Sequence, residues 1–148
     1  MSELTKIFLT SGLTIVGGVI LFVAGQIVVK FILEPMHGLK ETLAGIQYAF
    51  IYHDQAIHTP ISGDGDRSDK AAESFRKLAS DVHSRACAIP FYRVVAALSF
   101  GFLPRKDNVR KAAIELRGLS NSVHQPDRSK NGDRVARICR LLGLDPLQ

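Results

Sequence analysis

Tryptophan is absent from this sequence of 148 residues, cysteine occurs only twice, and no Asn-x-Ser/Thr triplet is present. Two cysteines cannot build a disulfide framework. Cys87 and Cys139 both lie in apolar-periodic stretches, where buried thiols are expected. These scarcities favour a reducing compartment in which the chain is not glycosylated.

Recognisable chemistry is equally scarce. Asp54 and His58 are one helical turn apart and could hold a metal, but the sequence nominates no further ligand. Cys87 and His83 have i, i+4 spacing, without a carboxylate that would orient the histidine. No phosphate-binding glycine loop is found outside the apolar N-terminal run. We therefore expect no catalytic residue, no metal and no cofactor, in a protein that is not an enzyme.

Strand-like alternation of apolar and polar residues is also missing, as is any internal repeat. Apolar residues instead recur at steps of three and four, which is typical of amphipathic helices. The predicted fold class is all-α. It consists of a single N-terminal transmembrane helix followed by a small cytoplasmic helical bundle of about four to five helices.

One long hydrophobic run is present, because the residues from Ile7 to Val29 carry no charge. As a helix they span about 35 Å, more than the roughly 30 Å hydrocarbon core of a bilayer. Lys30 can snorkel toward the headgroups, which keeps Phe31–Leu33 in the apolar segment. A cleaved signal peptide is the alternative, although its apolar region is shorter, about 7–15 residues. We predict an N-terminal tail and transmembrane helix over 1–34, anchored in membrane lipid.

Small residues recur along one face of this helix, at Ser11, Thr14, Gly18 and Gly25. Thr14 and Gly18 form a small-xxx-small pair, a spacing that lets two backbones approach closely within a membrane. Glycine is also frequent in membrane helices generally. The stripe favours helix packing in the membrane, either as a homo-oligomer or as a subunit of a membrane complex.

Lysine placement predicts the orientation of the span. Lys6 precedes it, whereas Lys30, Lys40 and a basic domain follow it. Positively charged flanks are retained on the cytoplasmic side of membranes. We predict a single-pass protein of the cell membrane, with its N-terminus outside and its C-terminal domain in the cytoplasm.

Residues 35–148 are predicted to form one helical bundle domain, with a flexible linker at 58–68 that is rich in turn-forming residues. The first bundle helix is expected over about 36–57. Its apolar stripe is wider than one neighbouring helix would cover. We therefore expect a partner-binding apolar face on it, made up of Leu39, Leu43, Ile46 and Phe50.

A further helix is expected from Ser68 or Asp69, and others over about 108–123 and 135–142, the last ending at a C′ glycine, Gly143. The mostly apolar segment Phe91–Leu103 lies between them and is too short to cross a membrane. We expect it to be the central helix of the bundle, with insertion into the membrane interface as the alternative.

Residues 105–140 hold ten basic and four acidic side chains. Such a surplus can attract anionic lipid headgroups or nucleic acid. The interleaved carboxylates and the lack of aromatic neighbours argue against nucleic acid, and a solvated helix face is the simpler interpretation. The residues singled out for binding an anionic partner are Arg110, Lys111, Arg134 and Arg137.

Without a catalytic feature, the sequence favours a single-pass membrane-anchored helical interaction or scaffold protein, which self-associates or acts as a subunit of a membrane complex. One alternative is a membrane-surface protein that binds anionic lipid or nucleic acid through 105–140. The other is a membrane-active effector or pore component, in which the span and 91–103 both engage lipid.

Overall fold

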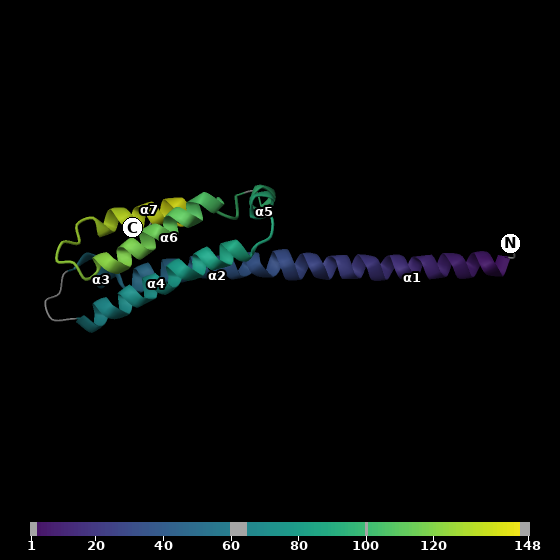
Figure 1. Cartoon of the computed structure of the whole chain (residues 1–148), viewed down its shortest axis with the longest axis horizontal. Helices are drawn as coiled ribbons and strands as arrows, with labels where there is room; N and C mark the ends of the chain where they lie inside the picture. Colours follow the sequence, from purple (N-terminus) through teal and green to yellow (C-terminus); the bar gives the residue numbers. More distant parts are fainter. Residues whose placement is uncertain (1–2, 60–64, 100, 146–148) are drawn as a thin grey trace.

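The computed structural model describes residues 3–59, 65–99 and 101–145, and all regular structure within these ranges is helical. The predicted all-α class is thereby confirmed. Figure 1 shows one long helix projecting from a bundle formed by the rest of the chain. In chain order the elements are α1 (Glu3–Val28), the π-helical turn η1 (Val29–Leu33), α2 (Glu34–Tyr52), α3 (Asp54–His58), α4 (Gly65–Ala88), α5 (Tyr92–Leu98), α6 (Lys106–Ser122) and α7 (Asn131–Leu142).

The projecting helix is the apolar N-terminal segment. A continuous helical path runs from Lys6 to Tyr52, and its most apolar window is not buried against any other part of the protein. Within the described ranges this is the one helix long and apolar enough to cross a membrane. The predicted apolar N-terminal helix is confirmed in its length and composition.

A π-helical turn joins the projecting helix to the bundle. Proline has no N–H to donate, so Pro35 cannot continue the α-helical bonding pattern. Just before it, the backbone N–H of Glu34 donates to the carbonyl oxygen of Val29, five residues back. This turn takes in one more residue than an α-helical turn. The helix therefore passes Pro35 and continues as α2.

In the bundle, α4 lies between α2 and α6, and α7 packs on the other side of α6. The apolar stripes predicted from the sequence supply the core between these helices. Fully burying one large apolar side chain contributes about 1.5–3 kcal/mol. The largest fully buried apolar side chains are Phe50, Phe75, Leu39, Ile46, Ile57, Leu116, Leu119 and Ile138.

The predicted central helix over Phe91–Leu103 is wrong. The central position belongs to α4, and α5 has seven residues, of which only Tyr92 is buried. The physical reason lies at the start of the segment. Pro90 follows α4, and Phe91 takes the left-handed conformation with φ of 50°, so the chain turns away from the bundle. The Tyr92 hydroxyl then fastens the segment by donating to the Pro104 carbonyl oxygen at 2.7 Å.

Two other boundaries differ from the sequence prediction. Residues 60–64 of the predicted linker at 58–68 lie outside the described ranges. Of the described linker residues, Thr59 is extended, whereas His58 ends α3 and 65–68 form the first turn of α4. The predicted helix over 36–57 is interrupted at His53, where φ is −102° and ψ is 19°. This interruption separates α2 from α3, whose Ile57 is buried in the core.

The C-terminal part is tied to α3 by polar contacts. The Asn131 amide nitrogen donates to the Ile57 carbonyl oxygen at 3.0 Å, and Arg128 donates to the carbonyl oxygens of Ala56 and Thr59. At the end of α7, Gly143 has φ of 68°, which confirms the predicted C′ glycine.

Candidate functional site

The small-residue stripe lies on the exposed part of α1. A methyl group added at Gly18 or at Gly25 would meet no atom within 4 Å beyond its chain neighbours and the backbone of its own helix, so both backbone surfaces are open. The Thr14 hydroxyl donates to the Thr10 carbonyl oxygen at 2.9 Å, which satisfies it within its own helix. Ser11 is likewise exposed. All four predicted packing residues are therefore accessible to a neighbouring helix.

The predicted partner-binding face on α2 is a core face instead. Leu39 and Ile46 have no exposed area, and Leu43 and Phe50 are 8% and 1% exposed. These side chains pack in the core, where α2 lies against α4, and the ring centroids of Phe50 and Phe75 are 6.0 Å apart. The face is thus already covered within the chain, which corrects its assignment to a partner.

The opposite side of α2 carries a second row of residues, which the sequence interpretation did not separate from the first. We call it the outer row: His37, Glu41, Ala44, Tyr48 and Ile51, all exposed. Its steps of four and three residues match the seam of a coiled coil. Tyr48 and Ile51 are 66% and 62% exposed, and the Tyr48 ring stacks on that of Tyr52 at 5.7 Å.

The π turn decides how the outer row relates to the small-residue stripe. In an uninterrupted α-helix, steps of seven from Gly18 would lead through Gly25 to Leu39 and Ile46, on the core face. The extra residue taken in by η1 rotates the downstream helix by about 100°. As a result the face that carries Gly18 continues into the outer row at Ala44. One accessible face therefore extends from α1 through α2.

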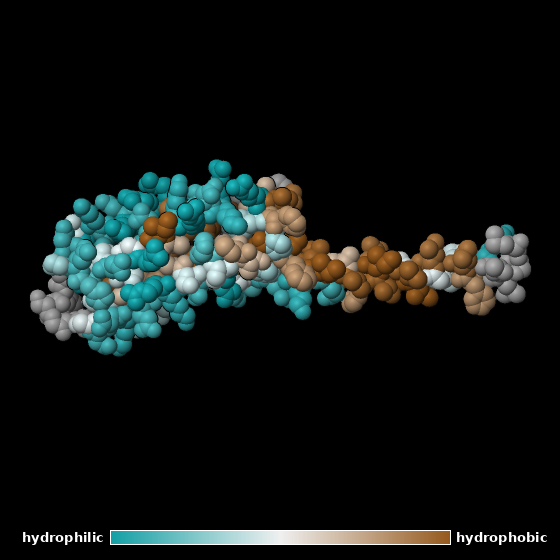
Figure 2. Space-filling model, in the orientation of Figure 1, coloured by the Kyte–Doolittle hydropathy of each residue, from teal (hydrophilic) through white to brown (hydrophobic). Residues whose placement is uncertain are grey.

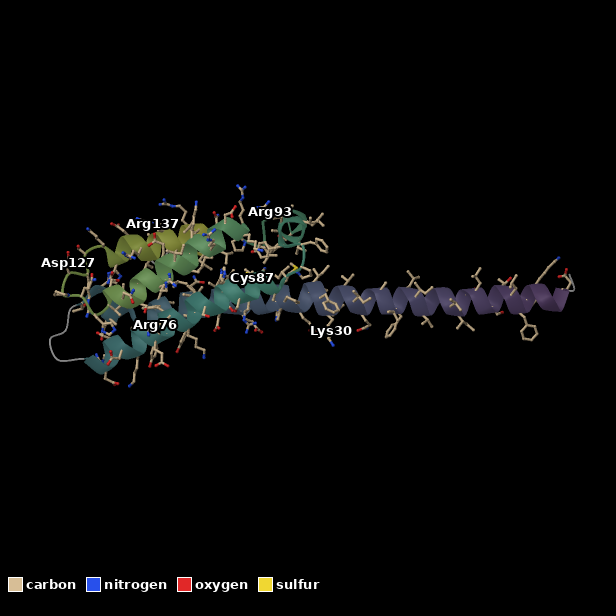
Figure 3. The ribbon with its side chains drawn as sticks, viewed as in Figure 1. Lys30, Arg76, Cys87, Arg93, Asp127 and Arg137 are labelled. Atoms are coloured by element: carbon tan, nitrogen blue, oxygen red, sulfur yellow. The ribbon has the colours of Figure 1, made fainter. Side chains whose placement is uncertain are left out.

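The four predicted anion-binding residues differ in their surroundings. Glu115 of α6 accepts from Arg137 at 2.8 Å and lies 3.6 Å from Arg134, so both α7 arginines are engaged within the bundle. Arg137 is seen on α7 in Figure 3. Arg110 instead lines a groove between α4 and α6, and Lys111 is exposed on α6. Arg134 and Arg137 thus share one carboxylate partner, whereas Arg110 lines a groove that includes no residue of α7.

The titratable side chains away from these surfaces make contacts within the bundle. His53 lies edge-on to Phe75, with ring centroids 5.6 Å apart, and desolvation lowers its pKa from 6.5. Burial raises the pKa of Tyr92 to about 12, consistent with its role as a hydrogen-bond donor. The His58 and Asp54 side chains are 3.7 Å apart and exposed, and no three metal-ligating side chains converge in the described ranges.

The chain matches no protein-family model, no curated protein and no solved structure. Its class is therefore defined by its own architecture. It is an all-helical protein in which one N-terminal helix, long and apolar enough to cross a membrane, continues into the core of a bundle.

Proposed function

We propose that this protein is a single-pass membrane-anchored scaffold that self-associates through one face of its long helix. The observation that carries the proposal is the continuous accessible face formed by the small-residue stripe on α1 and the outer row on α2. Because α2 is also a core helix, contacts made along this face hold the bundles of two copies beside each other.

Membrane insertion follows from the cost of leaving α1 in water. Its large side chains are exposed from Ile7 to Val28, for example Phe8 at 76% and Leu21 at 75%. Each such side chain would gain about 1.5–3 kcal/mol on leaving water. An exposed apolar surface of this extent marks an interaction with a membrane or another protein. The charge-free length from Ile7 to Val29 matches the thickness of a bilayer, which favours a membrane over another protein as the cover of α1.

Within the membrane, hydrophobicity does not drive helices together. Association there depends on close packing, which small residues allow. Gly18 and Gly25 leave the backbone open to such packing. Beyond the membrane, Tyr48 and Ile51 supply apolar contacts that are driven by water exclusion. Two weak interactions on one rigid helix reinforce each other, because forming the first raises the effective concentration for the second.

The proposed orientation places the bundle in the cytoplasm. Lys30 and Lys40 follow the apolar run, whereas Lys6 alone precedes it. Protease added to intact cells should leave α2 to α7 undigested, and protease added to inverted vesicles should digest exposed bundle segments. Digestion from the outside of intact cells would reverse the proposed orientation.

Site-specific photo-crosslinking tests self-association. A photoreactive phenylalanine analogue placed at Tyr48 of the full-length chain in native membranes should give a covalent dimer of the chain. Ile114 is the matched control, because it is an exposed apolar residue of α6, 55% exposed, away from the outer row. Equal yields at both positions, or no dimer from Tyr48, would contradict the proposal.

The contribution of the span is tested in the same assay. Gly18→Ile should lower the dimer yield from Tyr48, because a branched side chain keeps the two backbones apart. Ile20→Val changes α1 without filling the open backbone surface and should preserve the yield. An unchanged yield with Gly18→Ile would limit the interface to the outer row.

A further inference from the structure

The segment around α5 exposes a second apolar surface that the self-association face does not include. We call it the α5 patch, and its exposed fractions run from 57% to 83%. Soluble surfaces rarely gather large apolar side chains in this way without a ligand. The patch is made up of Phe91, Val94, Leu98 and Phe102.

The location of the α5 patch points to what covers it. The Phe102 ring lies 4.4 Å from the Lys40 ammonium of α2, and Phe102 and Ser99 share a hollow with Leu33, the last residue of η1. The patch is therefore level with the point at which the apolar helix enters the bundle. In Figure 2 the hydrophobic end of the bundle adjoins the hydrophobic projecting helix, and Figure 3 places Arg93 and Lys30 at this same end.

We propose that the α5 patch inserts into the interface of the same bilayer that α1 crosses, an inference that rests on the proposed membrane anchoring. Continuity with the end of the apolar helix commits the patch to lipid, since a bilayer around residues 7–33 has its surface at the level of Leu33. The aromatic patch residues Phe91 and Phe102 flank α5, and Val94 and Leu98 lie on it, so an amphipathic helical turn with aromatic neighbours faces the membrane interface.

The charged side chains around the α5 patch favour insertion into a bilayer interface. Arg93, Arg105 and Lys106 line a hollow beside α5, together with the carboxylate of Asp107. Cationic side chains next to an inserted apolar face gain from anionic headgroups. An inserted face of this kind lies about 5–10 Å into the boundary between headgroups and acyl chains.

Insertion would give the protein two attachments to one membrane. A single helix leaves the bundle free to tilt and to rotate about the helix axis, whereas a second contact at α5 fixes both. The left-handed backbone at Phe91, with φ of 50°, and the hydrogen bond from Tyr92 to Pro104 hold the patch outside the bundle core. Fixing the rotation also fixes the direction in which the outer row of α2 faces along the membrane surface.

The absence of tryptophan makes a direct test possible, because a single introduced tryptophan is the only indole in the chain. Three full-length variants, Phe102→Trp, Phe22→Trp and Ile114→Trp, are reconstituted in phosphatidylcholine/phosphatidylglycerol vesicles that contain brominated acyl chains. Phe22 lies in the proposed span, and Ile114 is exposed on α6. We expect strong bromine quenching at Phe22→Trp, clear quenching by shallow bromines at Phe102→Trp, and none at Ile114→Trp.

Each of the other outcomes contradicts either the insertion of the α5 patch or the membrane anchor. Quenching at Phe22→Trp but not at Phe102→Trp refutes insertion of the α5 patch and leaves the membrane anchor intact. No quenching at Phe22→Trp refutes the anchor itself. A Phe102→Trp emission that shifts to shorter wavelength with protein concentration, without bromine quenching, assigns the patch to a second copy of the chain and refutes lipid insertion.

Discussion

Phe50 and Tyr48 lie two residues apart on α2 and face opposite ways, which makes them a matched pair for testing which face of this helix is core. Phe50 is 1% exposed, and Tyr48 is 66% exposed. Replacing each by alanine removes an aromatic ring from the same helix. We expect Phe50→Ala to destabilise the bundle strongly and Tyr48→Ala to leave it nearly unchanged.

The magnitudes follow from burial. Truncating a buried phenylalanine to alanine costs about 3–5 kcal/mol. That figure includes the loss of the Phe50–Phe75 contact, since an aromatic pair contributes about 0.5–1.5 kcal/mol beyond its buried area. A domain of this size has a total stability of about 5–15 kcal/mol. Surface substitutions such as Tyr48→Ala usually change stability by no more than about 0.5 kcal/mol.

The assay is urea unfolding of the full-length chain in mild detergent, followed by far-ultraviolet circular dichroism. The detergent ratio is chosen so that the chain is monomeric, because self-association would otherwise add to the apparent stability. A large fall in the transition midpoint for Phe50→Ala alone is expected. If Phe50→Ala unfolds with the wild-type midpoint but abolishes photo-crosslinking, the face of Leu39 and Phe50 binds a partner and our assignment of the core is refuted.

Three further predictions concern groups in and around the bundle. Asn131→Ala should lower the unfolding free energy by about 1–3 kcal/mol in the same assay, because the Ile57 carbonyl oxygen loses its donor; an unchanged midpoint would contradict this. Burial lowers the pKa of His53 below 6.5, so the unfolded chain binds more protons and stability should fall as the pH drops through 6.5. His53→Gln should flatten that part of the pH–stability curve, and an identical slope in both proteins would exclude His53 as its source. Cys87 is exposed, so its predicted burial is wrong, whereas Cys139 is buried as predicted. A maleimide should label Cys87 in the folded protein but Cys139, whose pKa is raised by burial, only after unfolding, as mass spectrometry can follow.

Hydrophobic periodicity predicted the helices well because the buried face of a helix has the same apolar spacing whichever element covers it. The helix predicted from Ser68 or Asp69 and the one predicted over about 108–123 are both present, and their side chains Phe75 and Leu116 are buried. Glycine after the last periodic residue located the end of α7 for an equally local reason, since Gly143 adopts a left-handed conformation that other residues disfavour.

The local sequence does not show which element covers an apolar stripe. The sequence shows that Leu39 and Ile46 share a face, but only the fold shows that α4 occupies it. The π turn is similarly hidden, because one extra residue within an apolar run leaves no compositional trace. Its effect is to separate the core face of α2 from the small-residue face of α1.

The segment after Pro90 failed as a central helix for a different reason. Its mostly apolar composition is that of a core helix, but composition does not show whether a helix is long enough to reach the core. Its seven-residue helix and the left-handed Phe91 leave the four side chains of the α5 patch outside the bundle core. The sequence contained the alternative, an interfacial segment, but did not show that the patch lies beside the end of the apolar helix.

Amide hydrogen exchange of the whole chain in lipid vesicles tests the proposal that α1 crosses a membrane. The α1 window packs against nothing else in the protein, so its amides have no tertiary protection of their own. We predict that amides from Ile7 to Val29 exchange as slowly as those of the buried α2 segment from Leu39 to Phe50. Rapid exchange over Ile7–Val29, alongside a protected Leu39–Phe50 segment, would show that α1 does not cross the membrane.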